Sequence, residues 1–275
     1  MKKLHVEKNS VQETLVIPLY ARSKCSSLYP EIFKDDTAEK LMARVDYDFS
    51  ALDKKQSFFT RFAYLEAACR QNDIAVEVKE YLSAHPYASV VNVGCGLDCT
   101  AESCDNGHCK IYNVDFEDVI SLRNKLVPKN ERTETIATDV NGNEWLDVID
   151  DENGVIFFAM GVLYYFTQKN ALSLAKRIAD KFEKGVFVFD AANAKAVKLM
   201  VKTLIKQAKI DNVDAFFSVN DVEKDFSDFG KHKVSAKGYM LGYTDLKFKS
   251  VSPLYRALAK VADGKMGMKI IKIEF

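Results

Sequence analysis

Hydrophobic and polar residues follow two different periods along this chain. Within residues 38–45 and 58–81, apolar residues recur every three or four positions, which is the period of an amphipathic helix. Beyond Pro86, short apolar runs alternate with helical patterns. Pro86 also favours a boundary here, because helical geometry is disfavoured for the residue before a proline. We therefore expect a helical N-terminal cap over residues 1–85 and a main domain over residues 86–275.

The alternation in the main domain predicts a sheet of mostly parallel strands. The expected strands are 89–93, 110–115, 133–139, 155–160, 185–190, 233–240 and 268–275. The main helical stretches between them are 118–126, 168–182, 194–210 and 253–262. Strands that alternate with helices form βαβ units with helices on both faces of the sheet. Several strands are continuously apolar, as expected for strands buried on both faces, so we predict an α/β fold.

The turn after the first expected strand, Gly94-Cys95-Gly96, is the most informative stretch of the chain. Glycines after a buried strand allow a sharp turn and the close approach of a ligand to the backbone. A nicotinamide or flavin fingerprint has a third glycine three residues later, for close packing of the following helix. Cys99 stands at that position, which disfavours a pyrophosphate ligand. The turn instead favours an adenosine cofactor without phosphates, namely S-adenosylmethionine.

Carboxylates end the next two expected strands. Asp115 can accept hydrogen bonds from both ribose hydroxyls, and Asp139 can contact the adenine amino group while Val140 packs against the ring. Each feature alone has a simpler interpretation, as a tight turn or a helix cap. Ligands bind at the carboxyl ends of the strands in an open α/β sheet, so the coincidence of all three features predicts one cofactor site.

The overall composition is that of an ordinary globular protein. Hydrophobic residues make up 48% and charged residues 28%, with 39 basic and 39 acidic side chains. A zero net charge gives no general attraction to nucleic acid or to an acidic membrane. Apolar runs are too short for a transmembrane helix, and residues 1–8 lack the apolar segment of a signal peptide. We expect a cytoplasmic protein without nucleic-acid or membrane partners.

Four of the six cysteines are close together in the sequence, at positions 95, 99, 104 and 109, with His108 beside them. Their spacing contains no C-x2-C pair, which is the usual feature of a zinc site. We therefore expect reduced thiols and no metal.

Several motifs together resemble the leucine carboxyl methyltransferase family, most closely its bacterial polyketide O-methyltransferase-like branch of the tetracenomycin type. The motifs are at 90–98, 105–107, 112–123, 137–147 and 155–166, with further similarity at 17–22 and 45–49. The resemblance runs from about residue 14 to residue 190. It implies a class I methyltransferase fold, which is Rossmann-like, with a mostly parallel seven-stranded sheet and an N-terminal helical cap. It also implies S-adenosylmethionine as the cofactor.

The resemblance also implies roles for individual residues. Arg70 matches the family arginine that pairs with the methionine carboxylate of the cofactor, and Gly94 and Gly96 line the methionine portion. The expected cofactor-binding residues are Arg70, Gly94, Cys95, Gly96, Asp115, Phe116, Asp139, Val140 and Met160. The substrate-pocket candidates are Tyr20, Arg22, Met160, Tyr164 and Tyr165, and no residue is assigned as catalytic.

Two positions depart from the family pattern. Met160 stands where the family usually has glutamate, and Thr100 where it usually has arginine. These losses leave open a catalytically degenerate protein that binds S-adenosylmethionine. A nicotinamide-dependent oxidoreductase is a less favoured alternative.

The chemistry of the acceptor stays open at this point. A carboxylate is ionised at neutral pH and needs no base, whereas a hydroxyl needs a base nearby. The four histidines lie outside the motifs and none is a convincing base, which favours a carboxylate acceptor or catalysis by positioning alone. We predict an O-methyltransferase that acts on a carboxylate or hydroxyl of a small molecule. The oligomeric state is also open, with a homodimer as one option.

Overall fold

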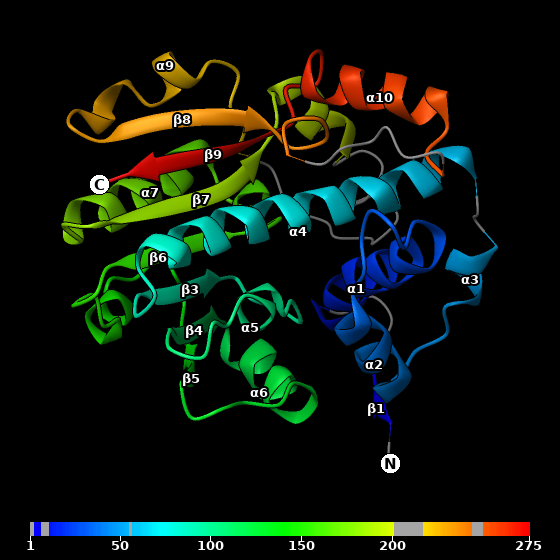
Figure 1. The fold of residues 1–275 in the computed structure, drawn as a ribbon, viewed down its shortest axis with the longest axis horizontal. Helices are drawn as coiled ribbons and strands as arrows, with labels where there is room; N and C mark the ends of the chain where they lie inside the picture. The colour runs from blue at the N-terminus through cyan, green and yellow to red at the C-terminus, as the bar shows by residue number, and fades with distance from the viewer. Residues whose placement is uncertain (1–2, 7–10, 55–56, 201–216, 244–249) are drawn as a thin grey trace.

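A seven-stranded sheet forms the centre of the computed structural model, which describes residues 3–6, 11–54, 57–200, 217–243 and 250–275 (Figure 1). The strands are β3 (Ser89–Val93), β4 (Lys110–Asp115), β5 (Thr133–Ala137), β6 (Val155–Ala159), β7 (Gly185–Ala191), β8 (Lys233–Gly238) and β9 (Lys269–Glu274). They are ordered β5-β4-β3-β6-β7-β9-β8. The strands from β5 to β7 pair in parallel, and β9 runs antiparallel to both β7 and β8. The predicted mostly parallel seven-stranded sheet is confirmed.

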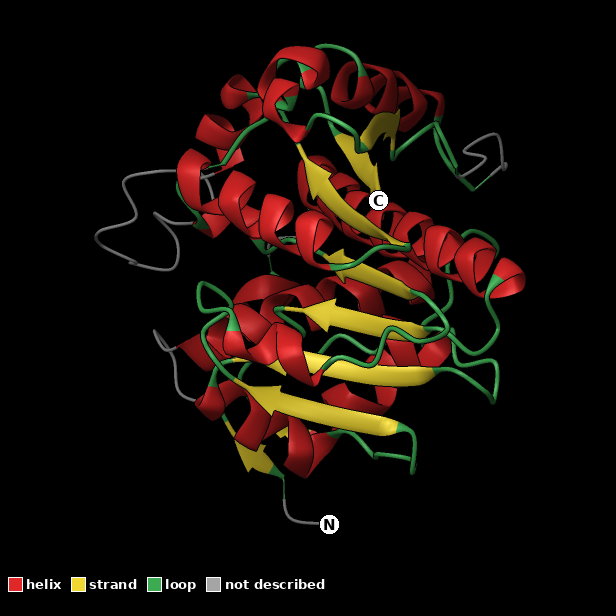
Figure 2. Cartoon of the chain, turned by 90° about the vertical axis from the view of Figure 1, so that its left-hand side faces the viewer, coloured by secondary structure: helices red, strands yellow, loops and turns green. Residues whose placement is uncertain are grey.

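Helices cover both faces of this sheet (Figure 2). The helices are α1 (Val11–Leu28), α2 (Asp36–Arg44), α3 (Ser50–Asp53), α4 (Phe58–Ala84), α5 (Thr100–Ser103), α6 (Glu117–Leu126), α7 (Gln168–Lys181), α9 (Val222–Asp225) and α10 (Pro253–Asp263). Short 3-10 helices are η1 (Glu144–Val148), η2 (Leu163–Tyr165) and η3 (Ser227–Phe229). Two further strands, β1 (Leu4–His5) and β2 (Val45–Asp46), form a separate parallel pair. The helix expected at 194–210 is helical from 194 to 200, and its remainder lies outside the described residues.

Successive residues of the central strands face two different cores. Val90 and Ile156 pack with α4 on one face, whereas Val91 and Phe157 pack with α7 on the other. Adjacent side chains in a strand point to opposite faces, so a strand between two helical layers must be apolar at every position. This explains why β3, β6 and β7 are buried along their whole length.

Helix α4 lies along the sheet and shares its core. Ser57 caps its first turn by accepting a hydrogen bond from the Thr60 amide, and the helix ends at Ala84, just before Pro86. Its buried Ile74 and Val78 belong to the same apolar cluster as the strand residues. Thus the expected boundary after residue 85 falls at the end of α4, and the division into residues 1–85 and 86–275 stays a prediction.

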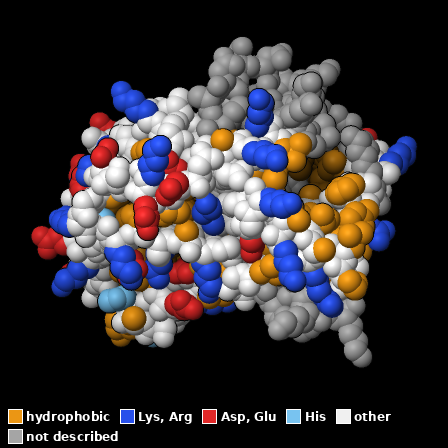
Figure 3. Space-filling model, turned by 90° about the horizontal axis from the view of Figure 1, so that it is seen from above, with side chains coloured by type: hydrophobic (Ala, Val, Ile, Leu, Met, Phe, Trp, Pro, Cys, Tyr) orange, Lys and Arg blue, Asp and Glu red, His pale blue; other side chains and the backbone are white. Residues whose placement is uncertain are grey.

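The surface above α10 carries apolar side chains. Seen from above, they gather together with lysine and arginine side chains over the part of the molecule where α10 lies (Figure 3). Leu254 and Val261 of α10 are 56% and 41% exposed.

Among the described helices, none combines the length and the apolar character that crossing a membrane requires.

Candidate active site

The turn after β3 has a backbone that needs glycine. Gly94 and Gly96 have φ angles of +68° and +48°, which are unfavourable for residues other than glycine. A Cβ atom on Gly94 would lie 2.6 Å from Cγ2 of Val162. The Gly94 amide donates to the Val114 carbonyl at 2.8 Å, which ties the turn to the end of β4. The predicted glycine turn therefore has the conformation that its residues indicated.

Asp115 lies at the carboxyl end of β4 and holds this turn. Its Oδ2 accepts a hydrogen bond from the Gly96 amide at 2.8 Å, and its Oδ1 accepts one from the Phe116 amide at 2.8 Å. Burial raises the pKa of Asp115, although these two amides act in the opposite direction. Each carboxylate oxygen keeps acceptor capacity, so the side chain can still receive two hydroxyl groups.

The opposite side of the turn is braced by Arg123, which is 2% exposed. Its Nη1 donates to the carbonyls of Gly96 (3.0 Å) and Asp98 (2.5 Å), and its Nη2 donates to Glu102 at 2.6 Å. A planar guanidinium with several donors suits such a site, because it satisfies several acceptors from one direction. Arg123 was not singled out from the sequence; an arginine on an apolar face of an amphipathic helix was the available signal.

The Asp98 carboxylate is a second hydrogen-bonding centre beneath the turn. It accepts hydrogen bonds from Gln71 of α4 (3.3 Å), Asn92 of β3 (3.2 Å) and the amide and hydroxyl of Thr100 (3.0 and 2.8 Å). Burial raises the pKa of Asp98, with Arg22 and Thr100 acting to lower it. The turn is thus connected to α4 as well as to the sheet.

Arg22 and Tyr20, both expected in the substrate pocket, lie within the N-terminal helices. Arg22 is 5% exposed, with Nε 3.1 Å from Asp35 and Nη1 3.9 Å from Asp98. Tyr20 donates to Asp53 at 2.6 Å, and its ring stacks on Phe49 at 5.1 Å. Both side chains already have protein partners, so their contact with an acceptor stays a prediction.

The residues expected at the adenine surround the ends of β4 and β5. Asp115 pairs with Ala137, and the Thr138 amide donates to the Asp115 carbonyl at 2.9 Å, so the two strand ends lie side by side. Asp139 is exposed and Phe116 is 53% exposed, whereas Val140 is buried. An open edge with an acceptor and two apolar side chains is suited to a flat aromatic base.

Arg70 lies on α4, beside the carboxyl end of β7 and the turn after β6. Its Nη1 donates to Asp190 at 3.1 Å, and 21% of its side chain is exposed. A Cβ on Gly161 would lie 3.3 Å from Nη1 and Nη2, so the guanidinium lies against this glycine of the turn after β6. Met160, the residue before it, is half-buried and packs on the core shared with α4.

Further polar side chains near Arg70 were missed from the sequence. Asp190 is the last residue but one of β7, near the carboxyl end of the strand as Asp115 is in β4, so the same strand-end rule could have found it. Glu66 lies four residues before Arg70 and accepts a hydrogen bond from the Tyr239 hydroxyl at 3.0 Å. Burial raises the pKa of Glu66, against lowering by Arg70 and Tyr239.

Two tyrosines follow β6 in η2. Tyr164 is 5% exposed, and burial raises the pKa of its phenol well above the usual range, with Asp190 adding to the rise. Tyr165 is 56% exposed. Of the two substrate-pocket candidates, only Tyr165 presents most of its side chain to the surface.

All six cysteines are buried, and none of them forms a disulfide bond. Burial raises the pKa of Cys104 to about 11 and that of Cys25 and Cys99 to about 12. A thiol that stays protonated is a poor nucleophile. In the part of the chain that the structure describes, no three or more histidine, cysteine or acidic side chains form a group that could hold a metal ion.

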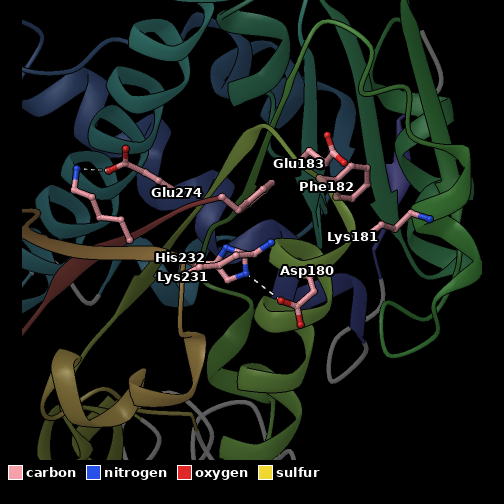
Figure 4. A pocket seen from close by; sticks show the side chains of 9 residues that line it. Asp180, Lys181, Phe182, Glu183, Lys231, His232 and Glu274 are labelled. Atoms are coloured by element: carbon pink, nitrogen blue, oxygen red, sulfur yellow. Dashed lines mark hydrogen bonds and ion pairs between the residues drawn. The ribbon is translucent and has the colours of Figure 1, made fainter.

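A separate hollow of about 680 Å³ lies near the amino end of β7 (Figure 4). Its lining includes Asp180, which contacts His232 at 3.0 Å, and Glu183, which precedes β7. Residues that precede a strand lie at its amino end, whereas ligands of open α/β sheets bind at the carboxyl ends. This hollow is therefore distinct from the glycine-turn site.

The glycine-turn site fits S-adenosylmethionine. Asp115 offers acceptors for ribose hydroxyls, and Phe116 offers an apolar surface for the base. The buried Nε of Arg70 has no hydrogen-bond partner among the described residues, so this cation retains a donor for a carboxylate. The chain thus offers complementary groups for the adenosine and for the amino-acid portion.

Comparison with known proteins supports this interpretation. The leucine carboxyl methyltransferase family model matches residues 16–179. The tetracenomycin polyketide synthesis O-methyltransferase TcmP of Streptomyces glaucescens is 29% identical over 182 residues, 66% of each chain. The S-adenosyl-L-methionine-dependent methyltransferase dpfgK of Gibberella zeae is 29% identical over 211 residues, 70% of this chain and 69% of the relative. This chain thus matches about two thirds of the length of each relative.

Solved structures share the fold. The plantazolicin methyltransferase BamL, crystallised with a triazolic desmethylPZN analog and SAH, has a TM-score of 0.52 at 12% identity. The match covers 96% of this chain and 99% of BamL. At this identity the likeness concerns the fold, and it confirms the methyltransferase fold that the motifs predicted.

Proposed function

We propose that this chain, which belongs to the leucine carboxyl methyltransferase family, transfers a methyl group from S-adenosylmethionine to an oxygen atom of a small molecule. The family match confirms the family predicted from the motifs, and by family the chain is an S-adenosylmethionine-dependent methyltransferase. It also sets aside the nicotinamide-dependent alternative. The finer part of the proposal, an oxygen of a small molecule, is supported by the name of TcmP, an O-methyltransferase of polyketide synthesis.

The observation that carries the proposal is the meeting of three features at one edge of the sheet. The Gly94 turn, Asp115 and Arg70 come from β3, β4 and α4, and they offer backbone, acceptor and cation to one extended ligand. When bound, S-adenosylmethionine supplies a methyl group on a sulfonium, which is a good leaving group. The protein therefore has to bind, orient and shield the reacting atoms.

The experiment is titration calorimetry with S-adenosylmethionine, followed by a methyl-transfer assay on a panel of phenols and aromatic carboxylic acids. We expect binding and turnover of at least one panel member. Binding without turnover on the whole panel would support the degenerate alternative that Met160 leaves open. The absence of binding would contradict the proposal itself.

Replacement of Asp115 by asparagine should weaken cofactor binding. The new amide group would face the Gly96 or Phe116 amide, both donors, and the charged acceptor for the ribose would be lost. Hydrogen bonds to charged groups contribute about 1.5–3 kcal/mol, so the Kd for S-adenosylmethionine should rise roughly tenfold to hundredfold. Calorimetry measures this change. An unchanged Kd would remove Asp115 from the proposed site.

Replacement of Glu66 by glutamine should separate the two acceptor classes. With a hydroxyl acceptor, the Glu66 carboxylate near Arg70 is a candidate base, and its loss should then lower kcat roughly 10²- to 10⁴-fold. A carboxylate acceptor needs no base, so its kcat should change little. Parallel assays with a phenol and a carboxylic acid measure the difference. Glu80→Gln, an exposed position on the same helix, is the matched control.

A further inference from the structure

A buried ion pair joins α4 to the carboxyl end of β7. Asp190 is 1% exposed, and its two oxygens are divided between two elements. Oδ2 accepts from Nη1 of Arg70 at 3.1 Å, and Oδ1 accepts from the Gly161 amide at 2.6 Å. One carboxylate therefore fixes Arg70 relative to the turn after β6.

The turn after β6 also contacts the cofactor turn. Gly161 has a φ of +71° and lies against the guanidinium of Arg70. A side chain at this position would make a close contact with the guanidinium. The next residue, Val162, lies against Gly94. Two consecutive residues thus connect the Arg70–Asp190 pair to the glycine turn, which places the pair at the edge of the proposed site.

Arg70 has donors left after it pairs with Asp190. Asp190 occupies Nη1, whereas Nε has no partner among the described residues. Nε and Nη2 form one side of the planar fork, and this side can bind a carboxylate through two parallel hydrogen bonds. Nε itself is buried, while the side chain as a whole is 21% exposed. The guanidinium can accordingly hold a second carboxylate.

Asp190, and not Glu66, accepts the hydrogen bond that Arg70 donates. Glu66 lies near Arg70, but its hydrogen bond is to Tyr239. A long arginine side chain loses considerable rotamer freedom when a ligand fixes it. An arginine that Asp190 already holds needs no further ordering, which favours binding through preorganisation.

We propose that Asp190 is a positioning residue, which holds Arg70 so that its remaining donors bind the methionine carboxylate of S-adenosylmethionine. The inference rests on the proposed function, because it assigns a task within the same cofactor site. Asp190 itself does not touch the cofactor in this arrangement. Its effect should therefore be confined to ligands that carry the carboxylate.

The test compares two ligands by titration calorimetry. S-adenosylmethionine carries the carboxylate, whereas 5′-methylthioadenosine keeps the adenosine and sulfur but lacks the carboxylate-bearing chain. Asp190→Asn and Arg70→Met should each raise the Kd for S-adenosylmethionine roughly tenfold to hundredfold, the effect of losing charged hydrogen bonds. The Kd for 5′-methylthioadenosine should stay unchanged. The double variant should bind S-adenosylmethionine no more weakly than Arg70→Met alone.

Asp115→Asn is the matched control, because it should weaken the binding of both ligands. Equal weakening of both ligands by Asp190→Asn would overturn the proposal and indicate a structural role. Additive losses in the double variant would overturn it as well. If Asp190→Asn does not fold, Asp190→Glu keeps the charge but displaces it, and should show the same ligand contrast. A wild-type chain that binds no S-adenosylmethionine would instead refute the proposed function.

Discussion

Replacement of Gly94 by alanine should abolish cofactor binding and lower the free energy of unfolding by about 3–5 kcal/mol, from backbone strain and overpacking together. The backbone has a φ of +68°, which alanine disfavours. The new Cβ would also lie 2.6 and 2.8 Å from the two Cγ atoms of Val162. Because both methyl groups obstruct the position, rotation of the valine cannot relieve the contact.

Gly107→Ala is the matched control for this change. Gly107 has a φ of +84°, but a Cβ there would have nothing within 4 Å, so only the backbone cost of about 1–2 kcal/mol applies. Urea unfolding followed by circular dichroism measures both variants. Val162→Ala should restore part of the stability in the Gly94→Ala background. Equal losses at the two glycines would contradict the role of the Val162 contact.

Replacement of Arg123 by methionine should have the second largest effect, a loss of about 3–5 kcal/mol, as found when one partner of a buried ion pair is removed. The variant leaves the carbonyls of Gly96 and Asp98 without their donor and removes the cation beside Glu102. Because Gly96 belongs to the cofactor turn, affinity for S-adenosylmethionine should fall with stability. Urea unfolding and calorimetry on the same preparation measure both quantities.

Arg132→Met provides the comparison for Arg123. Arg132 also pairs with a carboxylate at 2.6 Å, that of Asp105, but its side chain is 37% exposed. Exposed ion pairs contribute about 0–1 kcal/mol, so this variant should lose little stability and keep its cofactor affinity. A similar loss for both arginines would show that burial and the carbonyl contacts at Arg123 are unimportant.

The strands of the sheet could be predicted closely from the sequence. The predicted ranges for β3 and β4 agree with the structure at both ends, because apolar runs there are bounded by a glycine turn and by Asp115. The prediction for β5 ran two residues too far. The chain leaves the sheet after Ala137, and Asp139 instead accepts hydrogen bonds from Asn141 in the following turn. From the sequence alone, polar residues that follow a strand do not reveal the last residue that pairs with the neighbouring strand.

At the proposed cofactor edge, the positions of residues that follow a strand could be predicted, but those of residues on helices less well. Asp115 and the glycine turn lie where the alternation of strands and helices places them. The pairing of Arg70 with Asp190 joins residues 120 positions apart, and no local pattern specifies it. Likewise, no local pattern specifies the ion pairs of Arg22 with Asp35 and Asp98. Long-range partners depend on how α1 and α4 pack.

The position of β9 within the sheet has a consequence for how the chain folds. In sequence β9 follows β8, yet in the sheet it lies between β7 and β8, and among the described strands β8 pairs with β9 alone. During synthesis β7 must therefore wait for a much later segment, with an unpaired apolar edge meanwhile exposed. Such edges invite pairing with other chains and slow the final assembly. This half of the sheet is consequently completed only after β9 has left the ribosome, whereas β3, β4, β5 and β6 can pair as soon as they have emerged.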